Sequence, residues 1–218
     1  IEGGSVGSQD SGDVGGIAGY TFAASFNNCV STGEIVYRSG AFSSFVIGGI
    51  SGVDMGASFT ECINRVNLTS WFGDVIVGGI AAYHINSGDI SKCINYGKIK
   101  INDKDEYYSY LGNVYAAGGI VGILGPSENQ SCIVSYCLNL GDIEIWGKGK
   151  LDRLDLCTGG IVGTDEMSNE SSANIYVQRC INYGNISVGV SKDSSRNNIN
   201  KLFTFGGIAG RFKYRSSI

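Results

Sequence analysis

The feature that most constrains the fold is a pair of short motifs that alternate along the chain. The first is Gly-Gly-Ile, a small residue, then Gly or Ala, and it occurs six times; the second, Cys-x-Asn-x-Gly-x-Ile with some substitution, occurs five times between these copies. Copies of the first motif begin 33, 30, 40, 41 and 47 residues apart. Such self-similarity is the signature of a solenoid or a propeller. The first motif covers Gly15–Gly19, Gly48–Gly52, Gly78–Ala82, Gly118–Gly122, Gly159–Gly163 and Gly206–Gly210, and the second covers Cys29–Ile35, Cys62–Leu68, Cys93–Ile99, Cys137–Ile143 and Cys180–Ile186.

The varying length of the repeat favours a solenoid over a propeller. A propeller blade needs four antiparallel strands and a nearly constant period, whereas each repeat here offers about three short apolar stretches and lengthens by insertion. A parallel β-helix tolerates insertions because extra residues leave at the turns. We therefore predict an all-β fold, a right-handed parallel β-helix (solenoid) of about five to six coils with loop insertions. We expect residues 1–218 to form this single domain, and to be a fragment of a longer chain.

Equivalent positions of the two motifs predict rows of stacked side chains. Three rows are expected to point inward, and a fourth row of asparagines precedes a glycine in most repeats. Asparagine tolerates the left-handed backbone of a tight turn, and stacked amides can hydrogen-bond from one repeat to the next. The inward rows are Ile17, Ile50, Ile80, Ile120, Ile161 and Ile208; Cys29, Cys62, Cys93, Cys137 and Cys180; and Ile35, Leu68, Ile99, Ile143 and Ile186; the fourth row is Asn64, Asn95, Asn139 and Asn182, with Ser31 in the first repeat.

Composition and charge exclude several function classes. The net charge is −4 and the basic residues at 211, 213 and 215 form only a short cluster, so the chain lacks the basic stripe of a nucleic-acid-binding protein. It has no run of 18 apolar residues, which predicts no membrane insertion, and no signal peptide is visible. With 34 glycines and 1 proline, the composition is unlike that of a disordered linker.

The motifs resemble the GLUG-type repeats of bacterial surface proteins, in which G-G-[IL]-V-G is followed by a spacer and C-x-N-x-G-x-I. The closest matches are Gly118–Gly122 with Cys137–Ile143, and Gly159–Gly163 with Cys180–Ile186; the second repeat departs, with Val66 in place of the glycine. Repeats of this type occur near IgA-specific metallo-endopeptidases and in adhesin-like proteins of gut and oral bacteria. The resemblance covers almost the whole chain, and it implies an extracellular location on the bacterial cell surface.

Catalytic motifs are largely absent. A zinc peptidase needs His-Glu-x-x-His, and the single histidine, His84, cannot supply it, so we interpret His84 as a loop or turn residue. The alternative is a carbohydrate-active β-helix enzyme, a polysaccharide lyase or hydrolase, which would need converging carboxylates. The candidate acids lie in polar inserts, where a solvated loop is the better interpretation; they are Asp103, Asp105, Glu106, Asp152 and Asp155.

The chain holds seven cysteines, an odd number. The five in the predicted row are expected to be buried, reduced and inert, since their side chains point the same way and fit disulfide geometry poorly. Cys132 and Cys157 lie outside the row, and whether they form a disulfide is left open by the sequence. The sequence contains no Cys-x-x-Cys pair, so it gives no indication of a zinc site. We expect no metal and no other cofactor.

The inserts are the predicted place for ligand contacts. Lys100–Ala117, Glu144–Thr158 and Ser187–Phe205 follow one edge of the predicted solenoid, and Ile123–Tyr136 and Thr164–Arg179 another. Aromatic side chains in the first set either bind sugars and proteins or cover strand surface. The candidate ligand-binding residues are Tyr107, Tyr108, Tyr110 and Trp146.

The small residues around the inward isoleucines allow two interpretations, a bend where bulk would clash or a flat docking surface. Together these features predict a non-catalytic repeat module of a surface protein, acting as an adhesive, spacer or presenting scaffold. Its expected partner is a glycan or protein on a host or neighbouring cell.

Overall fold

The protein is built from β-strands. The computed structural model describes residues 12–37, 45–71, 75–103, 115–148, 156–165, 173–191, 203–212 and 216–217, and these residues contain 26 strands and no helix. The absence of helix in this part of the chain agrees with the predicted all-β class. It follows from the sequence, which alternates apolar and small residues and lacks the helical period of 3.6.

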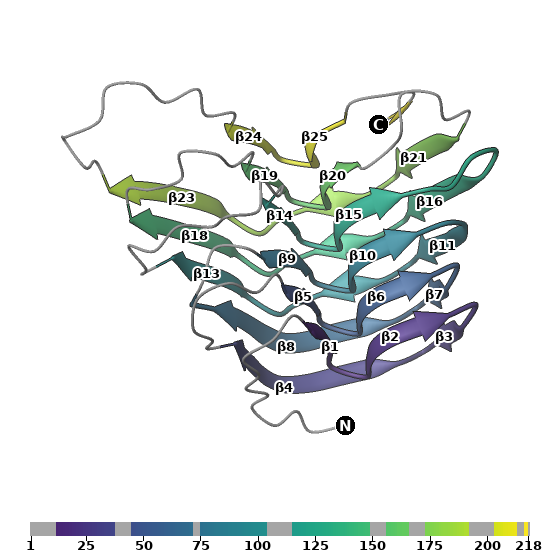
Figure 1. Cartoon of the computed structure of the whole chain (residues 1–218), viewed down its shortest axis with the longest axis horizontal. Coiled ribbons are helices and arrows are strands. Elements are labelled where there is room, and N and C mark those ends of the chain that lie inside the picture. The colour runs from purple at the N-terminus through teal and green to yellow at the C-terminus, as the bar shows by residue number, and fades with distance from the viewer. Residues whose placement is uncertain are drawn as a thin grey trace.

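The chain runs through four sheets in turn, and each new strand pairs with the strand one repeat earlier (Figure 1). Sheet I has six strands, β1 (Gly12–Gly15), β5 (Phe45–Gly48), β9 (Val75–Gly78), β14 (Tyr115–Gly118), β19 (Leu156–Gly159) and β24 (Phe203–Gly206). Sheet II has six, β2 (Ala18–Phe22), β6 (Ser51–Met55), β10 (Ala81–Ile85), β15 (Val121–Gly125), β20 (Val162–Asp165) and β25 (Ala209–Arg211). Sheet III has six, β3 (Ser25–Asn27), β7 (Ser58–Thr60), β11 (Gly88–Ser91), β16 (Ser131–Ser135), β21 (Asn174–Gln178) and β26 (Ser216–Ser217).

Sheet IV carries the second motif and has eight strands. In the first two repeats it is one long strand, and in later repeats three residues around the glycine of the motif separate two shorter strands. Its strands are β4 (Val30–Tyr37), β8 (Ile63–Ser70), β12 (Ile94–Asn95), β13 (Ile99–Asp103), β17 (Leu138–Asn139), β18 (Ile143–Lys148), β22 (Ile181–Asn182) and β23 (Ile186–Ser191). All pairings among the described strands are parallel. A complete repeat unit therefore has four or five strands, more than the three apolar stretches visible in the sequence.

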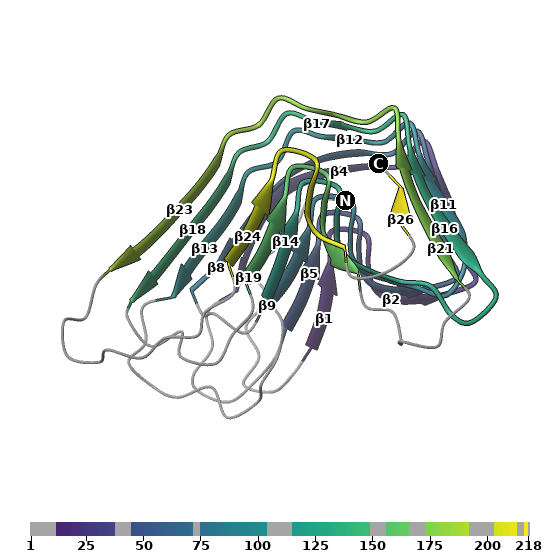
Figure 2. The same ribbon diagram turned by 90° about the horizontal axis from the view of Figure 1, so that it is seen from above.

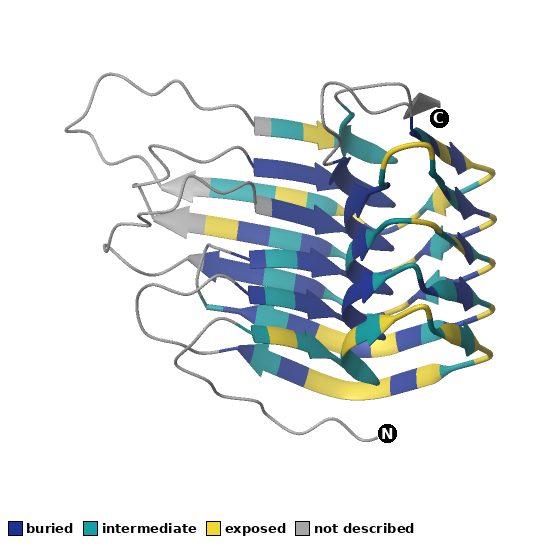
Figure 3. Cartoon of the chain, turned by 45° about the vertical axis from the view of Figure 1, so that its right-hand side comes forward, coloured by how far each residue is buried: buried dark blue, intermediate teal, exposed yellow. Residues whose placement is uncertain are grey.

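The predicted inward rows are confirmed. Ile50, Ile80, Ile120 and Ile161 are fully buried, and the backbone N–H of each donates to the carbonyl of the isoleucine in the next repeat. Burial falls off in the first and last repeat units (Figure 3). The rows of Leu68, Ile99 and Ile143 and of the interior cysteines are equally buried.

The buried residues form two separate cores. The isoleucine and cysteine rows pack with residues of sheets II and III in one cluster, and sheet I packs against the second half of sheet IV in the other (Figure 2). Ile47 belongs to one core and Ile50 to the other, so the glycine pair between them crosses the boundary. The asparagine row lies at the same boundary, because a Cβ on Gly49 would be 2.3 Å from Cγ of Asn64.

The asparagine row is a continuous ladder of amide hydrogen bonds. Nδ2 of Asn64 donates to Oδ1 of Asn95 at 2.7 Å, Asn95 to Asn139 at 2.8 Å, and Asn139 to Asn182 at 2.8 Å. Each of the four Nδ2 groups also donates to the carbonyl two residues further along the chain. Ser31 replaces asparagine in the first repeat, and its buried Oγ has no partner among the described residues. The predicted stacking is thus confirmed.

The predicted left-handed backbone at the ladder asparagines is wrong. Positive φ occurs instead at the residue before each row cysteine, with φ between 52° and 56° at Asn28, Glu61, Lys92, Tyr136 and Arg179. The turn into sheet IV lies there, three residues before the ladder position. All four ladder asparagines belong to strands and have no positive φ. The Oδ1 atoms of Asn64 and Asn95 accept from the backbone N–H two residues further along the chain.

The Gly-Gly-Ile segment is a bend, and the docking surface suggested by its small residues is wrong. Ser51, Ala81, Val121 and Val162 are fully buried. A Cβ on Gly48 would lie 1.7 Å from the carbonyl oxygen of Ser51, and one on Gly52 would lie 2.5 Å from that of Gly19. Backbone therefore packs on backbone at this corner, and bulk would clash.

Candidate ligand-binding face

The outer side of sheet IV carries a column of large exposed side chains. Each follows a ladder asparagine, and since successive strand residues point to opposite sides, it points to solvent. Backbone hydrogen bonds between neighbouring strands hold the column in register. The N–H groups of Tyr96, Leu140 and Tyr183 donate to the backbone carbonyls of Asn64, Asn95 and Asn139, respectively. The exposed fractions are 46% for Tyr96, 37% for Leu140 and 71% for Tyr183. The Arg65 guanidinium lies 5.1 Å from the ring centroid of Tyr96 and continues the column.

A second apolar column runs beside the first. Its members precede the ladder asparagines and are in register as Ile63, Ile94, Leu138 and Ile181. Ile181 is 50% exposed and the others are partly exposed. We call the two columns together, Arg65, Tyr96, Leu140 and Tyr183 with Ile63, Ile94, Leu138 and Ile181, the aromatic face.

Polar and charged pairs border the aromatic face on both sides. Lys98 Nζ lies 2.5 Å from Glu144 Oε1, and the Asn185 backbone N–H donates to Asp142 Oδ1 at 2.8 Å. Across the face, Lys92 Nζ lies 3.1 Å from Glu61 Oε1. An apolar centre with a polar rim is typical of surfaces that bind a partner.

Trp146 lies on a strand, so its predicted place in an insert is wrong. It belongs to β18, where Ile143 and Ile145 point into the core and Trp146 points outward, 54% exposed. The indole lies over the neighbouring β23, because a Cβ on Gly189 would be 2.1 Å from Cζ3 of Trp146. The side chain thus covers a strand with one ring face and leaves the other open to solvent.

The other predicted ligand residues, Tyr107, Tyr108 and Tyr110, lie outside the described residues, as do Asp105, Glu106, Asp152, Asp155 and the side chain of Asp103. The boundaries of the predicted inserts do change. β13 extends to Asp103 and β14 begins at Tyr115, so the strands take both ends of the first insert. Likewise β15 and β16 fill most of the predicted insert 123–136.

His84 is a core residue, so its interpretation as a loop or turn histidine is wrong. It lies on β10, opposite Asp54 of β6, and both side chains are fully buried. Nδ1 lies 2.6 Å from Asp54 Oδ1 and Nε2 lies 3.0 Å from the carbonyl oxygen of Gly88. The Gly88 carbonyl can only accept, and an ionised Asp54 carboxylate also accepts, so with Asp54 ionised both ring nitrogens donate and the ring is an imidazolium.

The pKa of His84 agrees with this geometry. Burial alone would lower the pKa, but the charge of Asp54 and its hydrogen bond raise it well above the ordinary value. Cys132 lies close enough to contribute to the same shift. Cysteine, histidine and aspartate are the residue types of a thiol peptidase, but here all three side chains are fully buried and the imidazole has no nitrogen free to accept a proton. The group is therefore structural.

The seven cysteines are free thiols, so Cys132 and Cys157 are not joined in this structure. The row thiols donate to backbone carbonyls, for example Cys62 to Phe26 and Cys93 to Ser91. Neighbouring thiols also shift one another's pKa: Cys93 raises the pKa of Cys62, whereas Cys137 lowers that of Cys93. Since Cys62 and Cys93 are both fully buried, reagents in solution do not reach either thiol.

Thiol reagents should separate the ends of the cysteine row from its interior. In the native chain Cys62, Cys93 and Cys137 should not react, while the half-buried Cys29 and Cys180 react slowly. Seven thiols should react in guanidinium. Mass spectrometry after pulsed alkylation measures this site by site, and fast native labelling of Cys93 would contradict the buried row.

Within the described residues no group of three or more His, Cys, Asp or Glu side chains is arranged to hold a metal ion. The same residues contain no helix long and apolar enough to cross a membrane.

No protein-family model, no curated protein and no solved structure matches this chain. The aromatic face was not singled out by the sequence reasoning, which treated the residue after each ladder asparagine as a variable spacer. Its signal was nevertheless present, since that position is Tyr96, Leu140 and Tyr183 in three successive repeats.

Proposed function

We propose that the chain is a right-handed parallel β-solenoid of five to six coils, and that it is a non-catalytic, adhesive repeat module of a bacterial surface protein with GLUG-type repeats. The order in which the chain passes through the four parallel sheets supports the solenoid. The repeated Gly-Gly-Ile and Cys-x-Asn motifs support the family and, through it, the extracellular location.

We further propose that the aromatic face binds a glycan on a host or neighbouring cell. The exposure of Tyr96 and Tyr183 in one column, with aliphatic residues beside them, carries this proposal. The two tyrosines are two strands apart, on the order of 10 Å, since neighbouring strands are about 4.8 Å apart. That spacing matches the length of a disaccharide unit, and the apolar C–H faces of sugar rings pack on aromatic rings.

The polar rim favours a glycan over an apolar partner. The charged and polar side chains that border the aromatic face offer donors and acceptors for sugar hydroxyl groups. They are Lys92, Lys98, Asp142, Glu144 and Asn185. The rigid parallel strands below hold the rings in place, so little ordering entropy is lost on binding. The insert tyrosines Tyr107, Tyr108 and Tyr110 are proposed as a second set of contacts.

Replacing a ring of the aromatic face should remove glycan binding and leave the fold unchanged. We expect Tyr183→Ser to weaken the affinity for a glycan retained by the wild-type chain by at least about tenfold, since hot-spot aromatics contribute roughly 2 kcal/mol. The measurement is a glycan array followed by titration calorimetry. Phe22→Ser is the matched control, because Phe22 has the same exposed fraction, 71%, on sheet II.

Three outcomes would contradict the proposal. Equal loss in Phe22→Ser and Tyr183→Ser would indicate a nonspecific apolar effect. Binding to cell-surface proteins stripped of glycans would place the partner in another class. Product formation from a polysaccharide, abolished by one Asp→Asn change, would support the carbohydrate-active enzyme, and Asp103 and Asp105 would then be changed first.

A further inference from the structure

The basic side chains gather on one side of the molecule. Among the described residues, every lysine and arginine side chain except that of Arg211 lies on the outer side of sheet IV or at the turn that leads into it. These residues are Arg65, Lys92, Lys98, Lys100 and Arg179.

The acidic side chains are distributed differently. Those on or beside the outer side of sheet IV, among the described residues, are Glu34, Glu61, Asp142 and Glu144. Those in the described parts of sheets I to III and their connections are Asp13, Asp54, Asp89, Glu128 and Asp165. In the part of the chain that the structure describes, positive charge is therefore in slight excess on sheet IV, although the chain has a net charge of −4. Such an asymmetry steers anions toward the aromatic face.

The two arginines on this side differ from the lysines in their partners. Lys92 and Lys98 lie 3.1 and 2.5 Å from glutamate oxygens, so their charges are neutralised within the protein. Among the described residues neither Arg65 nor Arg179 makes an ion pair, and both side chains are exposed. Their charges are therefore open to an anionic ligand.

A tyrosine ring orients each of these two arginines. The guanidinium of Arg65 lies 5.1 Å from the ring centroid of Tyr96, and that of Arg179 lies 5.2 Å from the ring centroid of Tyr136. Nη1 of Arg179 also donates to the Tyr136 hydroxyl. A ring face attracts a guanidinium and holds its planar fork. A fork held in this way binds an oxyanion through two parallel hydrogen bonds.

The two arginine–tyrosine pairs lie at opposite ends of the aromatic face. Arg65 belongs to β8 and Arg179 lies two residues before β22, with β12 and β17 between them. Three strand spacings separate the two arginines along the stack, about 14 Å. Tyr96 lies against Arg65, and Tyr183 is in the same repeat unit as Arg179. Each ring proposed to hold a sugar therefore has a guanidinium at its end of the face.

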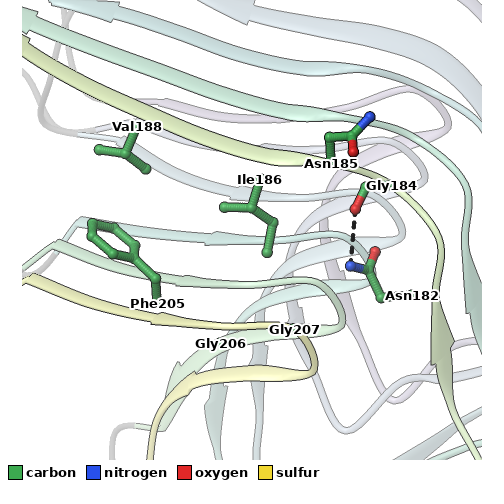
Figure 4. A pocket seen from close by; sticks show the side chains of 8 residues that line it. All are labelled: Asn182, Gly184, Asn185, Ile186, Val188, Phe205, Gly206 and Gly207. Atoms are coloured by element: carbon green, nitrogen blue, oxygen red, sulfur yellow. Dashed lines mark hydrogen bonds between the residues drawn. The ribbon is translucent and has the colours of Figure 1, made fainter.

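The acid beside the aromatic column has its charge offset by the protein. Oδ1 of Asp142 accepts from the backbone N–H of Asn185 at 2.8 Å and from its Nδ2 at 3.2 Å. Asn185 and Ile186 are on opposite sides of sheet IV (Figure 4), with Ile186 toward an inner groove of about 500 Å³. The Asn185 amide is thus on the outer side, where it reduces the repulsion between Asp142 and an anion.

We propose that the aromatic face selects a glycan that carries carboxylate or sulfate groups, and that Arg65 and Arg179 bind these groups. The inference rests on the proposed glycan-binding function and adds the charge of the ligand. Each guanidinium donates two hydrogen bonds to one acidic group, while a neighbouring sugar ring packs on Tyr96 or Tyr183. Uronic acids, sialic acids and sulfated sugars share this chemistry.

A glycan array that holds matched pairs tests the charge of the ligand. The probes are sialylated, uronate-containing and sulfated glycans, each beside a neutral form that lacks the acidic group. We expect the wild-type chain to retain acidic glycans and to bind their neutral forms at least about tenfold more weakly, since charged hydrogen bonds are the strong ones. The carboxylated and sulfated pairs show which of the two groups is bound.

Variants of the two arginines test which residues bind the acidic group. Arg65→Gln and Arg179→Gln should each weaken the affinity for the best-retained acidic glycan at least about fivefold and leave the affinity for its neutral form unchanged. Arg65→Lys keeps the charge without the fork, so it should restore only part of the affinity. The matched control is Glu61→Gln/Lys92→Gln, which removes a cation from the same side together with its partner. All these side chains are exposed, so melting temperatures should be unchanged.

The outcomes separate this inference from the proposed function. Equal retention of acidic and neutral forms would overturn the inference and leave glycan binding in place. Retention of acidic glycans that neither arginine variant weakens, or that the control weakens equally, would also overturn it. An array on which no glycan is retained would overturn both proposals.

Discussion

Gly119→Ala should strongly destabilise the protein, while Gly207→Ala should have almost no effect. A Cβ on Gly119 would lie 2.3 Å from Cγ of Asn139 and 2.1 Å from the carbonyl oxygen of Gly160, and backbone cannot move away without breaking the ladder. Overpacking of this kind costs about 1 to 3 kcal/mol, with more expected here because a buried amide ladder is displaced as well. At roughly 2 to 4 °C per kcal/mol for a chain of this size, the melting temperature should fall by about 10 °C.

Gly207→Ala is the matched control because it makes the same chemical change at the same position of the motif. Its Cβ meets no atom within 4 Å, so the effect should stay within about 0.5 kcal/mol. Thermal unfolding followed by circular dichroism in the β-sheet band gives both values. If the two variants lose equal stability, the glycine is needed for backbone freedom at that position, and the asparagine contact is not the reason.

Much of this architecture could be predicted because the two motifs fix positions relative to one another. Residues at equal distance from a motif lie side by side in neighbouring strands, so the rows of Ile50, Cys62 and Leu68 followed directly from counting. The amide ladder followed from the repeated asparagine. The spacing of residues from the motifs does not predict the division into two cores, because that division depends on how sheet I packs against sheet IV.

The errors have physical causes in particular residues. The left-handed position holds Asn28, Glu61, Lys92, Tyr136 and Arg179, which share no chemistry, so their side chains gave no sign of the turn. The predicted inserts begin too early because Lys100 and Trp146 lie on strands with their side chains pointing outward. In the sequence alone, such outward residues resemble the residues of an exposed loop. The core position of His84 was predictable in principle. Asp54 and His84 both lie six residues after the first glycine of their motifs, so they had to be neighbours.

Removing one member of that pair should be the most damaging change in sheet II. Asp54→Ala leaves the His84 imidazolium buried without its counter-ion, and breaking a buried ion pair in this way costs about 3 to 5 kcal/mol. The double variant Asp54→Leu/His84→Leu should recover most of the loss. Leu124, fully buried, already occupies the same column beside His84, so leucine fits the neighbouring strand. Urea unfolding of the wild type and both variants measures the three free energies.

The pH dependence tests whether the pair is charged. The pKa of folded His84 is raised, so its contribution to the free energy of unfolding is complete below the ordinary histidine value of about 6.5. That contribution is lost as the pH rises through the raised folded value. The wild type should therefore lose stability relative to the double leucine variant as the pH rises above about 6.5 toward the raised folded value. If the difference in the free energy of unfolding between the two proteins stays constant as the pH rises above about 6.5, His84 is not charged. In that case only one of its two ring nitrogens carries a proton.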